Sequence, residues 1–191
     1  PLKIGYDVEA SAAKYYKHDI DSSNLAEGKP FIYVTNKSDY VIEDYDNIGG
    51  LCVANSTNVT IRNISLVNAD SIKLLDTIKS QIFNINITNN TGSGIQIKSS
   101  SNDNFFENIT INSIYSYSHG LADVGSENNK FNNLVVNVSG FSSTGLYIRS
   151  SNSIINNSYI SSNLRSGVYF LYSSNNKIYN SYISGDSGDI S

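Results

Sequence analysis

The stretch FENITI, residues 106–111, decides the fold because variants of it recur along the chain. Each copy has an apolar residue, any residue, an asparagine, two further residues and a second apolar residue. The copies are IRNISL (61–66), IFNINI (82–87), FENITI (106–111), FNNLVV (131–136), INNSYI (155–160) and IYNSYI (178–183). Such self-similarity indicates a repeat architecture in which each unit packs on the next.

A second set of apolar segments lies between these copies. Their intervals of 21 to 26 residues define the repeat, with starts at Leu51, Ile72, Ile95, Leu121, Leu146 and Val168. The alternating pattern of residues 146–148 and 168–170 is typical of short strands and excludes helical repeats. A unit of this length with two or three strands is the size of one β-helix coil. We therefore predict an all-β, single-stranded, right-handed parallel β-helix with about six or more coils.

Equivalent residues of successive coils should form columns at the strand spacing of about 4.8 Å. One apolar column is expected in the core, made of Ile61, Ile82, Phe106, Phe131, Ile155 and Ile178. A structural ladder of hydrogen-bonded amides is expected at Asn63, Asn84, Asn108, Asn133, Asn157 and Asn180. The residues after them in four coils, Ile64, Ile85, Ile109 and Leu134, either thicken the core or form an exposed apolar stripe. Glycine before most coils is expected to allow a corner with positive φ.

The first 50 residues do not match the repeat. We assign residues 1–50 to an N-terminal cap with lead-in strands, including a short helix over 7–16 and a strand over 31–34. Residues 51–191 are assigned to the coils, and Ile190 resembles the start of another coil, so we expect the natural protein to continue. Unpaired strand edges at the ends would allow end-to-end self-association.

Composition excludes several partners. The formal net charge of −4 provides no electrostatic footprint for nucleic acid. The sequence has no apolar run long enough for a transmembrane segment. One cysteine, Cys52, excludes an intrachain disulfide. The acidic turns at residues 43–46 and 186–189 match no calcium-binding pattern, so no metal and no cofactor is expected.

The element SSNNKIYNSYIS (173–184) and the lead-in HDIDSSNLAEGKPFIYVTNKSDYVI (18–42) resemble NosD-type, pectate-lyase-like β-helix proteins. The resemblance covers about residues 14–191. It implies a secreted or cell-surface protein of the kind found in archaeal and bacterial envelopes, including S-layers. Because this class includes polysaccharide lyases, hydrolases, epimerases, adhesins and envelope proteins, the resemblance leaves the activity open.

The predicted outward columns contain no stacked pair of carboxylates, although acid–base cleavage of a glycosidic bond needs two within about 5–10 Å. Asp123 is unusual because it occupies a column whose other members are apolar and face inward. One interpretation is a catalytic acid with a raised pKa that acts with His119. The other is a local bulge that lets Asp123 reach water or a backbone donor.

A possible ligand-binding strip lies on the first strand of each coil, at Lys73, Lys98, Tyr147, Arg149 and Tyr169. Aromatic rings can stack on sugars, and cations can pair with acidic glycans. The alternative is an ordinary solvated sheet face.

Sequons for N-glycosylation are frequent, and the glycosylation candidates outside the ladder are Asn36, Asn55, Asn89, Asn137 and Asn156. Asn108 also lies in a sequon. As a ladder residue it is predicted to be buried, to bond along the rod and to carry no sugar.

These features favour a non-enzymatic structural or adhesive domain of a secreted or cell-surface glycoprotein. Carbohydrate, other envelope proteins and a second copy of the chain are its possible partners. The alternative function is that of a polysaccharide-active lyase, hydrolase or epimerase.

Overall fold

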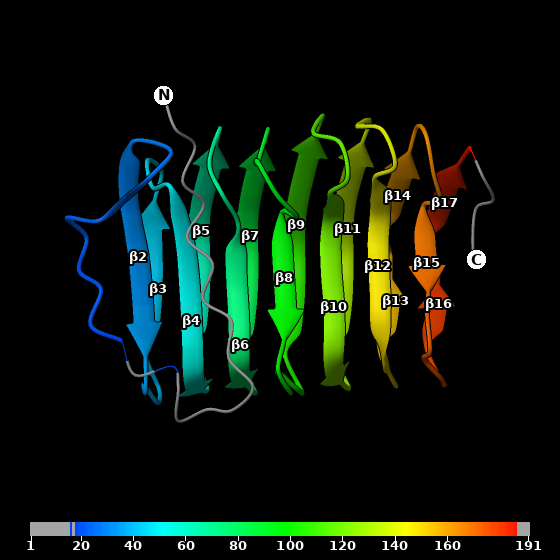
Figure 1. Cartoon of the computed structure of the whole chain (residues 1–191). Helices are drawn as coiled ribbons and strands as arrows, with labels where there is room; N and C mark the ends of the chain where they lie inside the picture. The colour runs from blue at the N-terminus through cyan, green and yellow to red at the C-terminus, as the bar shows by residue number, and fades with distance from the viewer. Residues whose placement is uncertain (1–15, 17, 187–191) are drawn as a thin grey trace.

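The computed structural model describes Tyr16 and residues 18–186, and within them the chain contains strands but no α-helix (Figure 1). The first sheet has the order β1 (Leu25–Ala26), β2 (Lys29–Thr35), β4 (Gly50–Thr57), β6 (Ile72–Ile78), β8 (Ile95–Lys98), β10 (His119–Glu127), β12 (Thr144–Ser151), β15 (Val168–Phe170). The second runs β16 (Lys177–Tyr179), β13 (Ile154–Asn156), β11 (Lys130–Val138), β9 (Phe105–Ser113), β7 (Gln81–Thr88), β5 (Thr60–Val67), β3 (Val41–Tyr45). Two further strands, β14 (Tyr159–Ser162) and β17 (Tyr182–Gly185), pair with each other, and β14 also pairs with β11.

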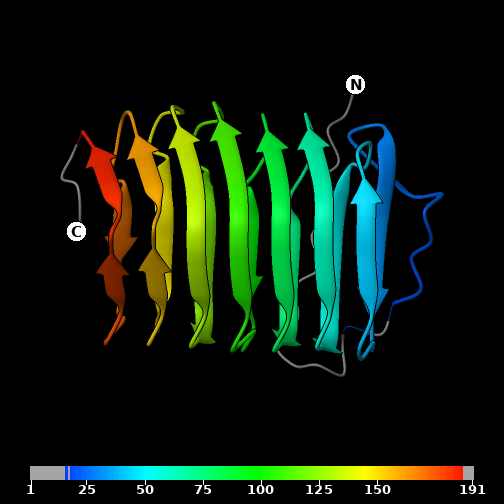
Figure 2. The ribbon, with the colours of Figure 1, turned by 180° about the vertical axis from the view of Figure 1, so that it is seen from behind.

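The chain alternates between the two sheets, which form opposite walls of a solenoid (Figures 1 and 2). Every strand pair is parallel except β1 with β2, so the remaining seven strands of the first sheet mark seven coils. Six steps at the usual strand spacing give a rod of about 29 Å. The predicted parallel β-helix is confirmed.

The first coil begins before the repeat recognised in the sequence. β2 pairs with β4 and β3 pairs with β5, so residues 29–45 already form a coil ahead of Leu51. The strand expected over 31–34 is part of β2. The helix expected over 7–16 and the coil expected at Ile190 lie outside the described residues, apart from Tyr16.

The core lies between the two sheets. Ile61, Ile82 and Phe106 are paired in register and fully buried, and the ring of Phe106 stacks on Phe131 at 5.0 Å between centroids. The four residues that followed the ladder asparagines are also core residues, with exposed fractions of 0–2% for Ile64, Ile85, Ile109 and Leu134. Burial of each such side chain stabilises the fold by about 1.5–3 kcal/mol.

The corner glycines have a different role from the expected one. Gly120 and Gly145 are not among the residues with positive φ, whereas many corner asparagines are. A Cβ on Gly120 would lie 2.2 Å from Val136 Cγ1 and 2.7 Å from the Gly145 carbonyl oxygen. These glycines are therefore required because the opposite wall of the coil and the backbone of the next coil leave no room for a side chain.

A second, smaller core lies outside the solenoid, against the first sheet. Its buried members are Tyr16, Ala26, Phe31, Cys52, Ala54 and Leu75. The Tyr33 hydroxyl donates to the Tyr16 carbonyl at 2.7 Å, and the Tyr16 hydroxyl donates to Ser99 Oγ at 2.9 Å. Tyr16 and Ala26 thus cover part of a sheet face that the sequence pattern had assigned to solvent.

Candidate functional site

The six ladder asparagines occupy corners with φ between 46° and 55°, and all six are exposed. Asparagine tolerates this left-handed conformation better than other residues with a Cβ. Four consecutive bonds join the column: Nδ2 of Asn63 donates to Asp44 (2.9 Å), Asn84 to Asn63 (3.2 Å), Asn108 to Asn84 (3.2 Å) and Asn133 to Asn108 (2.6 Å). The first rung, Asp44, was not part of the predicted column.

The expected burial of Asn108 is wrong, because its side chain is exposed. The left-handed corner turns it outward, while its neighbour Ile109 points into the core. The ladder also changes column after Asn133: Asn157 donates to Asn132 at 3.0 Å and Asn180 donates to Asn156 at 3.3 Å.

A second, buried ladder runs beside the core and was missed in the sequence. Asn104 Oδ1 accepts from the Ser80 amide at 2.9 Å, and its Nδ2 donates to the Thr77 carbonyl at 2.8 Å. Asn129 makes the same two bonds in the next coil: its Oδ1 accepts from the Asn104 backbone amide, and its Nδ2 donates to the Ser101 carbonyl. The available signal was a serine or asparagine two residues before five of the six apolar column residues, at Ser80, Asn104, Asn129, Ser153 and Asn176.

Asp123 is completely buried and pairs in register with Ile97 and Ile148. Its Oδ2 accepts a hydrogen bond from Asn129 Nδ2 at 3.1 Å. Burial raises the pKa of Asp123 to about 6, and hydrogen bonding by Asn129, Ser150 and Ser126 offsets part of that rise. The register shifts after Val124, but Asp123 does not reach water.

The structure does not bring His119 to Asp123. The His119 ring stacks on Tyr147 at 4.7 Å between centroids, whereas Asp123 pairs with Ile148, the inward-facing neighbour of Tyr147. Burial, followed by the charge of Arg165, lowers the pKa of His119 to about 4. The imidazole is therefore neutral at ordinary pH and lies on the outside of the first sheet.

His119, Tyr147 and Tyr169 form a stacked aromatic column on that face. Tyr147 lies between the other two rings, with 5.8 Å between the centroids of Tyr147 and Tyr169. The Arg165 guanidinium lies 5.5 Å from the Tyr169 ring centre, and Arg149 lies 5.6 Å from that of Tyr172. Because both faces of Tyr147 are covered, it presents its edge and hydroxyl to solvent rather than a flat platform.

The two lysines of the expected strip are separate from this column. Lys73 is only 5% exposed and pairs with Asp70 at 3.2 Å, so its expected role on an open surface is wrong. Lys98 is half-buried and is separated from Arg149 by Val124 of β10. Sequence reasoning missed Arg165 and Tyr172 because both lie in loops beside β15, outside the repeated columns.

Of the glycosylation candidates, Asn36 is exposed and Asn55, Asn89, Asn137 and Asn156 are half-buried. Four of the five take part in amide bonds between coils. Asn55 donates to Asn36 at 2.6 Å, Asn137 donates to Asn112 at 3.0 Å, and Asn156 accepts from Asn180 at 3.3 Å.

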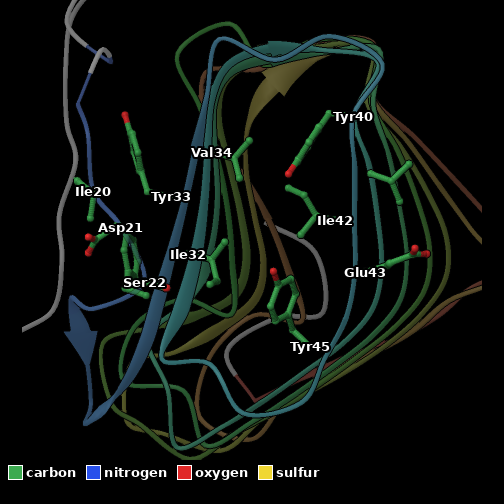
Figure 3. Close-up of a pocket in the computed structure, with 12 residues that line it drawn as sticks. Ile20, Asp21, Ser22, Ile32, Tyr33, Val34, Tyr40, Ile42, Glu43 and Tyr45 are labelled. Carbon is green, nitrogen blue, oxygen red and sulfur yellow. The ribbon is translucent and has the colours of Figure 1, made fainter.

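A hollow lies at the mouth of the solenoid, beside the first coil. It has a volume of about 450 Å³. Figure 3 shows Ile32, Val34 and Ile42 inside this mouth, with Tyr40 and Tyr45 at its rim. Its apolar floor is the end of the core rather than a set of catalytic groups.

Metal-ligating residues do not gather in this structure. Within Tyr16 and residues 18–186, no three His, Cys, Asp or Glu residues lie close enough together to hold an ion. In the same part of the chain, no helix has the length and apolar character needed to cross a membrane.

The fold and its ladders define a protein of the parallel β-helix class. A family model described as "Periplasmic copper-binding protein (NosD)" matches residues 9–190, and the chain belongs to this NosD family. No curated protein resembles the chain closely enough to count as a match. Among solved structures, a trypsin-treated form of QnrB1, titled a plasmid-mediated fluoroquinolone resistance protein, is 11% identical. The alignment covers 84% of this chain and 90% of that one with a TM-score of 0.22, a likeness that carries no argument.

Proposed function

We propose that this chain is a non-enzymatic, rigid β-helix rod that serves as a structural or adhesive element outside the cytoplasm. The observation that carries this proposal is the ladder of amide bonds from Asp44 to Asn133, which links five successive coils. Together with the buried ladder at Asn104 and Asn129, it ties each coil to the next through side chains as well as backbone. Such a solenoid keeps a fixed length.

The enzymatic alternative has less support. Asp123, its only acid candidate, has no exposed surface from which to reach a glycan. His119 is neutral and lies on the other face of β10. Acid–base cleavage requires two carboxyl groups on one substrate. A lyase or hydrolase assay on acidic polysaccharides is expected to show no turnover, and activity that is abolished by Asp123→Asn would contradict the proposal.

A periplasmic or extracellular location is part of the proposal and follows the description of the NosD family. The copper in that description does not fit this chain, which has no Met, one Cys and two His. Cys52 is buried, His18 lies beside Tyr33 of β2, and His119 lies beside Tyr147 of β12. Copper prefers thiolate, thioether and imidazole ligands, and these residues do not converge.

Rigidity can be measured directly with spin labels. Val41 and Lys177 belong to one register column and are six strand steps apart, so labels on V41C/K177C should be separated by about 29 Å plus the linkers. The pair V41C/K130C spans four steps and should give a distance shorter by about 10 Å. Narrow distributions with this difference are expected, and Cys52 should remain unlabelled because it is buried. A broad distribution for either pair would contradict a rigid rod.

Binding of an acidic glycan is a second candidate function. It is supported by Arg149 and Arg165, whose guanidinium groups lie over Tyr172 and Tyr169 on one face. Because the Tyr147 ring faces are covered, recognition would depend on charge rather than on stacking, and added salt should weaken it. Retention on immobilised polygalacturonate should fall in R149A/R165A and persist in K37A/K177A, whose lysines lie elsewhere. Equal retention of both variants would exclude this site.

A further inference from the structure

In the outer columns, the hydrogen bonds that asparagine side chains make to the asparagine or aspartate side chain of the neighbouring coil all have the same direction. In the outer ladder, each later asparagine donates its Nδ2 hydrogen to the preceding coil, as Asn84 does to Asn63. The same polarity holds in neighbouring columns for Asn58 to Asp39, Asn55 to Asn36 and Asn137 to Asn112. The side-chain dipoles are therefore aligned, with their N–H groups pointing toward the first coil.

Aspartates occupy the first rungs of two of these columns. Asp39 accepts from Asn58 at 2.5 Å, and Asp44 accepts from Asn63 at 2.9 Å. An ionised carboxylate accepts hydrogen bonds but has none to donate. Each aspartate thus accepts the hydrogen bond from the asparagine of the second coil. It has no hydrogen to donate to a further coil placed before the first one. Its negative charge also complements the N–H end of the aligned dipoles, as an anion does at a helix N-terminus.

The same coil carries the terminal edge of the second sheet. Within the described residues, β3 is the last strand of that sheet, and its exposed Glu43 accepts from Arg62 Nε at 2.6 Å. The corresponding edge of the first sheet is covered by β1, which pairs with β2. Figure 3 shows Glu43 and Tyr45 beside the open mouth. Charged residues on an edge strand oppose pairing with another chain.

We propose that Asp39 and Asp44 terminate the amide ladders and so keep the first coil from docking on the last coil of a second copy. To continue the columns, a second copy would have to accept hydrogen bonds from the first coil. The two carboxylates have no hydrogen to donate, so they cannot form these bonds. Their charge would in addition lose its contact with water at such a junction. Asparagine at these rungs would remove both obstacles, because it accepts from the following coil and donates onward.

The matched test compares two double variants. In Asp39→Asn/Asp44→Asn, the acceptor oxygens for Asn58 and Asn63 remain, so the coil keeps its bonds and gains two outward donors. In Asp76→Asn/Asp103→Asn, the same charge is removed in the middle of the rod; Asp103 lies in the column of Asp39, with φ of 58° against 53°. Both variants should retain the far-ultraviolet circular dichroism of the wild type.

Sedimentation velocity over a range of protein concentrations measures whether the rods associate. The wild type and the mid-rod variant are expected to sediment as monomers at every concentration. The end variant should show a sedimentation coefficient that rises with concentration, and negative-stain images should show rods of unchanged width and greater length. A monomeric end variant, equal association of the mid-rod variant, or end-to-end association of the wild type would each overturn the proposal. None of these outcomes bears on whether a single rod is rigid.

Discussion

Asn129 donates a 3.1 Å hydrogen bond to the carboxylate of Asp123 at a core position where the adjacent coils have Ile97 and Ile148. Burial raises the pKa of Asp123 to about 6, against about 3.9 for an unfolded aspartate. Between these two values the folded protein binds more protons than the unfolded chain. The free energy of unfolding contributed by this group therefore falls as the pH rises from about 4 to about 6.

Asp123→Asn should remove this cost while preserving the shape of the side chain. We expect the free energy of unfolding at pH 7.5 to rise by about 3 kcal/mol, with little change at pH 4. Urea denaturation at the two pH values measures both effects. Asp103→Asn, an exposed carboxylate, is the control and should change neither value appreciably. Equal destabilisation by Asp123→Asn at both pH values would show that the carboxylate is not strained.

His119 should show the opposite pH dependence. Burial and the charge of Arg165 lower its pKa to about 4, so the folded protein binds fewer protons than the unfolded chain between about pH 6.5 and 4. Its contribution to stability is lost as the pH falls through that range. Titration by NMR should leave the His119 imidazole neutral down to about pH 4.

Tyr147→Ala should raise that pKa toward its usual value because it uncovers one face of the His119 ring. The His119 resonance is identified by its loss in His119→Gln. If the pKa did not move in Tyr147→Ala, the stacking would not be the source of the burial.

The buried and exposed ladders should differ in their effect on stability. Asn104→Ala leaves the buried Ser80 amide and Thr77 carbonyl without partners, which should cost about 2–4 kcal/mol in the free energy of unfolding. Asn108→Ala removes an exposed rung and strains a left-handed corner, and should cost about 1–2 kcal/mol. Urea denaturation at neutral pH gives both values.

Asn108→Gly separates the two contributions at the exposed corner. Glycine loses the amide bonds but tolerates the φ of 53°. It should therefore be less destabilising than Asn108→Ala. A larger loss in Asn108→Ala than in Asn104→Ala would mean that the exposed ladder carries more of the stability than the buried one.

Gly120→Ala should be strongly destabilising because the added methyl group would lie 2.2 Å from Val136 Cγ1. Relief of this overlap requires β10 and β11, the two walls of this coil, to move apart, which should cost about 3 kcal/mol or more. Gly125→Asn provides the contrast, since φ is 71° there and a Cβ at this position would have no atom within 4 Å. Thermal unfolding should show a large fall in Tm for Gly120→Ala and a small one for Gly125→Asn.

Glycosylation should depend on the amide network. Asn108 donates to Asn84 and accepts from Asn133, so we expect its sequon to remain free of sugar although the side chain is exposed. Asn36 is exposed and its Nδ2 bonds only locally to Thr35 at 3.1 Å, which makes it the better acceptor. Glycopeptide mapping after expression in an N-glycosylating host tests both sites. An occupied Asn108 would contradict the prediction.

Much of the register could be read from spacing alone. Ile82, Phe106 and Phe131 lie in one core column because parallel strands without insertions place equivalent residues side by side. The inward position of Asp123 followed from the same alignment. The first coil was harder to recognise because β2 and β3 lack the asparagine of the pattern and have Asp44 in its place.

The sequence by itself determined the solenoid, its core columns and four rungs of its outer ladder, since these depend on a repeat that each coil obeys locally. Only the tertiary structure decided which surfaces face water. Lys73 is buried against Asp70, Cys52 lies in a buried cluster with Tyr16 and Ala26, and Asn108 turns outward at a left-handed corner. The physical reason is that exposure depends on contacts between segments far apart in the chain and on the side to which each corner turns its side chain, and the spacing of the repeat specifies neither.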